Sequence, residues 1–248
     1  MIGLPRAGDV RVLLLDADGN LFPSEEPAFV ASAEVTNRFL ASLGIDRAYT
    51  AEELRLTTTG KNFRTTAADL AAAHGVELDG PALTAAMLED WVAEERKIVT
   101  EYLGRVLRPD PAVLGPLRRL AARYRLAAVS SSALARLDEC FRATGLDELL
   151  PANVRFSAED SLPRPTSKPD PAVYRYALEQ LGVPAGEAVA VEDSLPGAQS
   201  AVAAGIPTVG NLVFVPPAER EIRRDALVEA GVALVIASWE ELTAALPG

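Results

Sequence analysis

The feature that most constrains the fold is an apolar run that ends in two acids, Val12-Leu13-Leu14-Leu15-Asp16-Ala17-Asp18-Gly19. Four apolar residues that stop at a turn signal are typical of a buried strand. If the strand geometry continued, Asp16 and Asp18 would point to the same side. Two carboxylates that close repel each other, so they share a proton or hold a cation. An ordinary Asp-Gly turn explains the pattern equally well, so a functional interpretation needs partners elsewhere in the chain.

The rest of the chain divides into a helical block and an alternating block. From about Ala28 to Leu103 the apolar spacing is helical and no strand pattern interrupts it. Beyond the Gly- and Pro-containing segment 104–111, short apolar runs alternate with helices, which predicts a parallel sheet with right-handed crossovers. The predicted strands are residues 12–15, 126–129, 154–156, 188–191, 207–209 and 233–236, and the predicted helices are residues 28–43, 51–56, 65–74, 81–103, 113–124, 133–144, 171–181, 197–204 and 239–246.

These patterns predict an α/β fold with two domains. The core would be a Rossmann-like, doubly wound parallel sheet formed by residues 1–22 and 108–248. An all-helical cap domain, residues 23–107, would be inserted after the first strand.

The composition narrows the possible functions. The net charge of −11 over 248 residues argues against nucleic-acid binding as the main role. No apolar run approaches the roughly 18 residues that span a bilayer, and the N-terminus lacks the apolar segment of a signal peptide. We therefore expect a cytoplasmic protein, monomer or dimer, without nucleic-acid or membrane partners. The only histidine, His74 before Gly75, is typical of a helix end, which excludes His-dependent triads.

Polar side chains follow several predicted strands at the points where they end. In an open parallel sheet, ligands bind outside the carboxyl ends of the strands. Each residue also has an ordinary explanation: Ser131 or Ser132 could cap a helix, Asp193 could cap the next one, and Lys168 could be a solvated loop residue. The combination is harder to explain in this way. The residues are Asp16 and Asp18 after the first strand, Ser130 after the second, Glu192 and Asp193 after the fourth, and Lys168 in a loop before a helix.

Phosphoryl transfer is the chemistry that needs this set. Asp16 could attack phosphorus and form an aspartyl-phosphate, while Asp18 protonates the leaving oxygen and later takes a proton from water. Carboxylates suit Mg²⁺, and Asp193 would complete a metal site with Asp16, Glu192 being a neighbour or a further ligand. Ser130 and Lys168 would hold phosphoryl oxygens.

At these residues the chain resembles the haloacid dehalogenase-like (HAD) hydrolase superfamily, in its branch with a helical C1-type cap that includes phosphatases and β-phosphoglucomutase. The resemblance implies Asp16 as nucleophile, Asp18 as acid/base with its backbone carbonyl on Mg²⁺, Ser130 with the adjacent Ser131 and Lys168 on phosphate, and Asp193 with Glu192 on the metal. Two features depart from the family pattern: Asn20 stands where Thr or Val is usual, and the loop 158–167 is rich in Pro. The motifs that match are 15–19, 128–132, 168–171 and 191–207.

Within this family we prefer a Mg²⁺-dependent phosphatase acting on a small phosphorylated metabolite, such as a sugar phosphate or a phosphoglycolate-like ester. Dehalogenases and phosphonate-cleaving members lack the second acid, here Asp18. Sugar-phosphate mutases keep it, but they carry a cap-hinge His where this chain has Ala28, so a mutase remains the alternative. A phospho-acceptor or a non-catalytic phosphate-binding protein is a further alternative. Lys61 and Arg64 in the cap are the candidates for substrate selectivity, which cap closure would impose.

Overall fold

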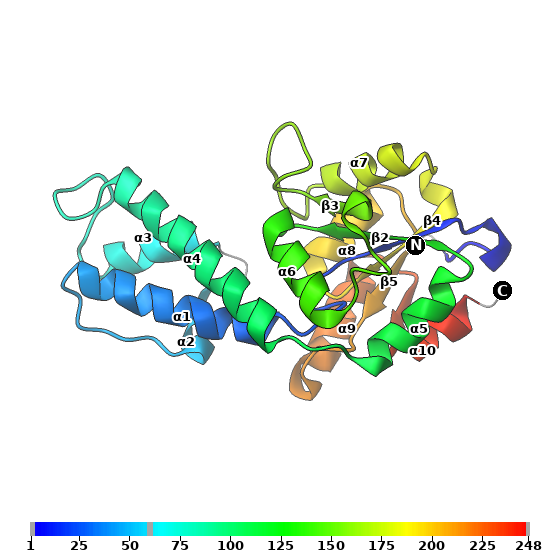
Figure 1. Ribbon diagram of the computed structural model, residues 1–248, viewed down its shortest axis with the longest axis horizontal. Helices are drawn as coiled ribbons and strands as arrows, with labels where there is room; N and C mark the ends of the chain where they lie inside the picture. The colour runs from blue at the N-terminus through cyan, green and yellow to red at the C-terminus, as the bar shows by residue number, and fades with distance from the viewer. Residues whose placement is uncertain (1–2, 59–61, 247–248) are drawn as a thin grey trace. The chain divides into compact units, whose positions relative to one another are not determined.

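The computed structural model describes residues 3–58 and 62–246 of the chain. The chain folds as two compact units. The first, which we call the core unit, comprises Met1–Pro23 and Leu107–Gly248, and the second, the helical unit, comprises Ser24–Val106. The helical unit is therefore inserted into the core unit in sequence, shortly after the first strand (Figure 1). None of the helices in the described part of the chain has both the length and the apolar character needed to cross a bilayer.

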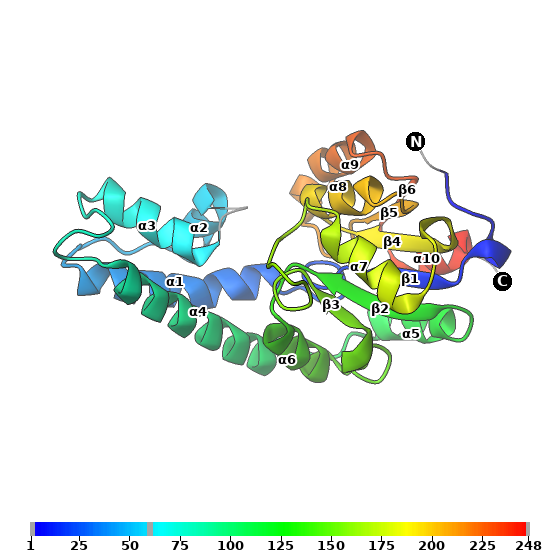
Figure 2. The ribbon, with the colours of Figure 1, turned by 90° about the horizontal axis from the view of Figure 1, so that it is seen from above.

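The core unit is built on a six-stranded parallel sheet with the order β3-β2-β1-β4-β5-β6. In Figure 2, β6, β5, β4, β1 and β2 follow one another from the top of the view downward, with β3 beside β2. The chain runs outward from β1 through β2 to β3, then returns to the other side of β1, which confirms the predicted doubly wound fold. The strands are β1 (Val12–Leu15), β2 (Arg125–Ser130), β3 (Arg155–Ser157), β4 (Ala188–Glu192), β5 (Thr208–Asn211) and β6 (Leu234–Ile236).

Helices cover both faces of this sheet. Right-handed crossovers place α5 and α6 on one face and α7, α8 and α9 on the other, and Figure 1 shows α7 above the strands with α5 and α10 below them. On the α7 face, Val12 and Leu14 of β1 belong to one buried cluster with Val173 and Tyr174. The helices are α1 (Glu25–Ser42), α2 (Ala51–Thr58), α3 (Phe63–Ala73), α4 (Ala85–Val106), α5 (Pro111–Ala121), α6 (Leu134–Thr144), α7 (Ala172–Leu181), α8 (Leu195–Ala203), α9 (Arg220–Glu229) and α10 (Trp239–Ala245).

Strand β1 is the centre of the core unit. Its four residues are fully buried, and its last residue, Leu15, is in register with Ala128 of β2 on one side and Val191 of β4 on the other. A strand enclosed in this way reads as a continuous apolar run, as the sequence does here. The direction of winding reverses between β1 and β4, and ligands bind at this switch point in open α/β sheets. A ligand site is therefore expected at the carboxyl ends of β1 and β4.

The helical unit consists of α1 to α4, with no strand among its described residues. Phe39 of α1 is its packing centre, in edge-to-face contact with Phe63 at 6.5 Å and with Trp91 at 5.9 Å between ring centroids. Helix α3 ends at Ala73, with His74 as its C-cap and Gly75 next at φ +82°, which confirms the helix end predicted at His74 and Gly75.

One helix was not predicted and one begins later than predicted. Helix α9 was not predicted because its sequence shows no apolar periodicity. Leu227 is the one residue of this helix that is buried. Helix α4 begins at Ala85 rather than at residue 81. The boundaries of the other predicted elements differ by a few residues, which is usual because helix ends are set by local capping contacts.

Candidate active site

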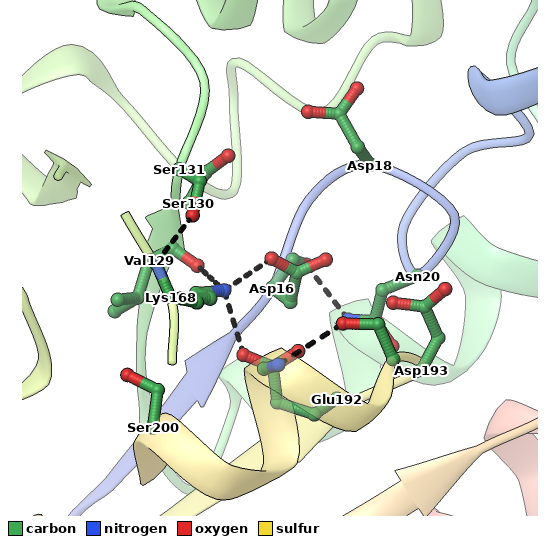
Figure 3. Close-up of polar contacts among 12 residues, drawn as sticks. Asp16, Asp18, Asn20, Val129, Ser130, Ser131, Lys168, Glu192, Asp193 and Ser200 are labelled. Atoms are coloured by element: carbon green, nitrogen blue, oxygen red, sulfur yellow. Dashed lines mark hydrogen bonds and ion pairs between the residues drawn. The ribbon is translucent and has the colours of Figure 1, made fainter. Parts of the chain in front are cut away.

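The two acids after β1 have different surroundings. The strand ends at Leu15, the Asp16 N–H donates to the Val191 carbonyl at 3.0 Å, and Gly19 turns the chain with φ +75°. Asp16 is buried. The Asp18 carboxylate points away from Asp16 (Figure 3) and accepts from Ser132 Oγ at 2.7 Å and Arg136 Nη2 at 2.9 Å. The expectation that both acids point to the same side is therefore wrong, because the turn replaces strand geometry after Leu15.

Lys168 reaches the buried end of β1 from its loop. Its side chain is only 5% exposed, so the interpretation as a solvated loop residue is wrong. The ammonium donates to the Val129 carbonyl at 2.8 Å, pairs with Glu192 Oε1 at 2.7 Å, and forms an ion pair with Asp16 Oδ1. Figure 3 shows Lys168 between these oxygens. A compact ammonium with three donors suits a position enclosed by three acceptors.

Burial and charge act against each other at this pair. Burial raises the pKa of Asp16 above its ordinary value, and the Lys168 ammonium opposes this shift. For Lys168, burial alone would lower the pKa, but the carboxylates of Asp16 and Glu192 raise it above its ordinary value. The ammonium therefore stays charged at neutral pH and holds a positive charge next to Asp16.

Three acids form a group that could hold a divalent cation. Carboxylate oxygens of Asp16, Glu192 and Asp193 all lie within 4.8 Å of one another, and all three residues are buried. Glu192 Oε2 has no hydrogen-bond partner among the described residues. Two cations, Lys168 and the more distant Arg223, face these three acids, so a negative charge is left over. Hard oxygen ligands are those that Mg²⁺ prefers. The residues therefore fit the metal that the sequence implied.

Glu192 is held by close packing on two sides. The Tyr174 hydroxyl donates to Glu192 Oε1, and burial together with the neighbouring carboxylates raises the pKa of Tyr174 well above its ordinary value, so the phenol stays protonated. On the other side, Gly197 of α8 leaves room for the carboxylate. A Cβ at this position would lie 1.8 Å from Glu192 Oε2. The position of the Glu192 carboxylate therefore requires a residue without a Cβ atom at position 197.

Gly197→Ala is expected to lower the free energy of unfolding by about 1–3 kcal/mol, because the new methyl group must displace a buried carboxylate. Gly115→Ala is the matched control, also within a helix, where the nearest atom to a new Cβ is 3.8 Å away. Without a clash, the better helix propensity of Ala should raise the stability by up to about 1 kcal/mol. Urea unfolding of both variants measures the difference, and equal effects would contradict the packing argument.

The serines after β2 accept hydrogen bonds from the backbone. Ser130 Oγ accepts from the Ser132 N–H at 3.0 Å, and Ser131 Oγ accepts from the Lys168 N–H at 3.1 Å. Because each oxygen accepts, each hydroxyl proton remains available for a ligand. Neither Ser131 nor Ser132 caps α6, contrary to one expectation: the N-cap position is Ala133, and the Leu134 N–H donates to Asp160 Oδ2.

The surroundings of Asp193 are defined by contacts at the helices α8 and α9. Ser194, not Asp193, caps α8, because its side chain accepts from the Gly197 N–H. Asp193 is instead contacted from α9, where Arg223 Nη1 donates to its carbonyl at 2.8 Å and lies 3.8 Å from Oδ2. Asp193 thus belongs to the acid group described above and is also within ion-pair distance of Arg223.

Several residues at the site were missed by sequence reasoning. Asn20, to which no role could be given, donates from Nδ2 to the Asp16 carbonyl at 2.7 Å and accepts from Asn211 at 2.8 Å. Arg136 and Tyr174 were also missed. Their signal is weak, since an Arg or Tyr within a helix has many ordinary explanations. Only for Asn20 did the sequence offer a signal, because Asn stands there in place of the Thr or Val that is usual in the family.

The two selectivity candidates of the helical unit have different outcomes. Lys61 lies outside the described residues. Arg64, on α3, forms a two-pronged ion pair with Glu89 of α4, at 2.6 Å and 2.7 Å, and both side chains are about half exposed. Its charge is thus shared with a neighbouring acid.

Comparisons with known proteins agree on one family. A family model described as haloacid dehalogenase-like hydrolase matches residues 10–205. Protein CbbY of Cereibacter sphaeroides is 30% identical over 239 residues, covering 95% of this chain and 98% of its own. Two solved structures are each 26% identical. A mutant of CbbY from Rhodobacter sphaeroides in complex with xylulose 1,5-bisphosphate has a TM-score of 0.66, covering 94% of this chain and 96% of its own. A HAD family hydrolase from Deinococcus radiodurans with bound phosphate and sodium has a TM-score of 0.65, covering 96% and 95%.

Proposed function

The chain belongs to the haloacid dehalogenase-like hydrolase family, and from this premise we propose that it is a Mg²⁺-dependent phosphatase that hydrolyses a small phosphomonoester. The observation that carries the proposal is the contact of the Lys168 ammonium with both Asp16 and Glu192 at the carboxyl ends of β1 and β4. This arrangement offers a nucleophile and a positive charge for phosphate at the same point. A phosphate-binding protein needs the charge but not the adjacent nucleophile.

In the proposed reaction, the Asp16 carboxylate attacks phosphorus while the bond to the leaving oxygen breaks, which gives an aspartyl-phosphate. Asp18 supplies a proton to the leaving oxygen, which requires its carboxylate to turn from Ser132 and Arg136 toward the substrate. In the second step Asp18 takes a proton from water, which attacks the phosphoryl group and restores the Asp16 carboxylate. Lys168 and the hydroxyl protons of Ser130 and Ser131 stabilise the charge that develops on the phosphoryl oxygens.

The cation would be held by the carboxylates of Asp16, Glu192 and Asp193, with the backbone carbonyl of Asp18 as a further ligand by family resemblance. A bound Mg²⁺ offsets the repulsion between these acids and an anionic substrate and polarises the phosphoryl group. The positions of these residues are fixed by the protein itself: β1 and β4 carry Asp16 and Glu192, and the Arg223 contact holds the Asp193 backbone.

For the substrate class, we propose a sugar phosphate. The supporting observation is that CbbY, whose sequence is similar over nearly the whole length, has been crystallised with xylulose 1,5-bisphosphate. We further propose that the helical unit provides selectivity, with Arg64 and Lys61 as candidates. For Arg64 this requires that the substrate compete with Glu89.

The experiment measures phosphate release by the full chain from sugar phosphates, sugar bisphosphates, phosphoglycolate and nucleotides. We expect release from at least one small ester in Mg²⁺, and loss of that activity in excess EDTA that Mg²⁺ restores. Absence of release from every ester in Mg²⁺ would overturn the proposal. Interconversion of glucose 1-phosphate and glucose 6-phosphate without net phosphate release would favour a mutase instead.

A further inference from the structure

Two fully buried amide side chains connect the candidate nucleophile to a distant strand. Asn20 and Asn211 are both 0% exposed. Asn20 lies in the turn after β1, and Asn211 is the last residue of β5, with β4 between the two strands. Asn20 Nδ2 donates to the Asp16 carbonyl at 2.7 Å, and Asn211 Nδ2 donates to Asn20 Oδ1 at 2.8 Å. We call these two side chains the amide relay.

The backbone fixes the direction of the amide relay. The Val213 N–H can only donate, and it donates to the Asn211 side-chain oxygen at 3.0 Å. The amide nitrogen of Asn211 must therefore face Asn20, whose oxygen accepts and whose nitrogen in turn faces the Asp16 carbonyl. Each contact in this chain joins a donor to an acceptor, and such chains of hydrogen bonds polarise one another. The Asn20 amide accepts on its oxygen and donates from its nitrogen, a role that a Val side chain at this position could not have.

The amide relay holds the carbonyl group of Asp16, whereas the sheet holds its N–H group. The Asp16 N–H is bound by the Val191 carbonyl of β4, but strand pairing of β1 ends at Leu15. Beyond this point Asn20 holds the Asp16 carbonyl. The same peptide leads into Ala17 and Asp18, so its orientation sets both acids. Figure 3 shows Asn20 beside Asp16, on the side opposite Lys168.

We propose that Asn211 is a positioning residue for Asp16, acting through Asn20; this rests on the proposed phosphatase activity. Reacting groups must be held within a fraction of an ångström, and misplacement by about 1 Å can cost roughly 100-fold in rate. Within the described part of the chain, no hydrogen bond or ion pair joins the Asn211 side chain to the three acids or to Lys168. Its replacement should therefore slow the chemical step and leave substrate binding unchanged.

The test compares Asn211→Asp with Thr208→Val. Asn211→Asp keeps the size and the acceptor for Val213, but places an acceptor against the oxygen of Asn20. Thr208 is equally buried, lies at the other end of β5, and loses one hydrogen bond, to the Ile206 carbonyl at 2.8 Å. With p-nitrophenyl phosphate at a temperature where both variants are folded, we expect kcat of Asn211→Asp to fall about 10- to 100-fold with KM within about twofold. Thr208→Val should keep the kcat of the wild type even if its Tm falls.

Two further measurements make the result decisive. In a double-mutant cycle, Asn20→Ala and Asn211→Ala together should cost no more in kcat than Asn20→Ala alone, because both break the same relay. Amide hydrogen exchange at residues 16–21 should be faster in Asn211→Asp and unchanged in Thr208→Val. If Asn211→Asp does not fold, Asn211→Ser, which is too short to reach Asn20, replaces it.

Unchanged kcat in the folded Asn211 variants, or additive losses in the cycle, would overturn the inference. A wild-type chain without activity on any ester would instead overturn the proposed function. In that case hydrogen exchange alone decides whether the amide relay orders residues 16–21. Exchange at these residues that is the same in Asn211→Asp as in the wild type would contradict the inference.

Discussion

Asp16→Asn is expected to lower kcat for phosphate release by at least about 10,000-fold, because an amide cannot form the aspartyl-phosphate. The fold should survive, since the change is isosteric and Lys168 keeps Glu192 and the Val129 carbonyl as partners. Acid quenching during turnover, followed by mass spectrometry, should find a phosphoryl group on the peptide that contains Asp16 in the wild type and not in the variant.

Two control variants separate the roles of the acids. Asp225→Asn makes the same change at an exposed acid of α9 and should leave kcat within about twofold. Asp18→Asn keeps the nucleophile, so with an aryl phosphate, whose leaving group needs no proton, it should still acquire the phosphoryl group but release it slowly. A phosphorylated Asp16→Asn protein, or full activity of that variant, would show that another residue is the nucleophile.

Lys168→Met is expected to have the largest effect on stability. Removing this ammonium leaves Asp16 and Glu192 buried without their cation, and breaking a buried ion pair from one side costs about 3–5 kcal/mol. The variant should also lose phosphatase activity, because it removes the ammonium that contacts Asp16 and Glu192. Urea unfolding in EDTA measures the stability without any contribution from bound metal.

The matched control is Lys97→Met, which makes the same substitution at an exposed ion pair. Lys97 is 73% exposed and lies 4.0 Å from Glu101 one helical turn away, an arrangement worth at most about 0.5 kcal/mol. If the two Met variants unfold at the same urea concentration, Lys168 does not balance the buried acids in solution.

The sequence was sufficient for the family, the fold and the proximity of Asp16, Lys168, Glu192 and Asp193. The family assignment made from Asp16, Ser130, Lys168 and Asp193 is confirmed by the family model that spans these motifs. The convergence followed from one physical rule, that parallel strands end at the same edge, together with apolar runs that stop at polar residues. The catalytic and binding roles of these residues stay predictions.

What could not be predicted depends on contacts between distant residues. Asn20 has a visible partner only once β5 is known to lie beside β4, because Asn211 follows it by most of the length of the chain. The Asp18 carboxylate is held by contacts with Ser132 and Arg136, which lie more than 100 residues further along the chain. Lys168 lies in a loop without periodicity, so its burial left no signal in the pattern.

The insertion of the helical unit directly after β1 has a consequence for how the chain folds during synthesis. The central strand is made first, but its neighbours begin only at Arg125 and Ala188. Such a fold has a high contact order, so it forms late and slowly. The segment Ser24–Val106, by contrast, is complete in sequence as soon as its last helix has left the ribosome. Until β2 emerges, the four apolar residues of β1 have no strand to pair with, and until β4 emerges one side of β1 stays unpaired. This is the interval in which a nascent chain of this protein is most exposed to aggregation.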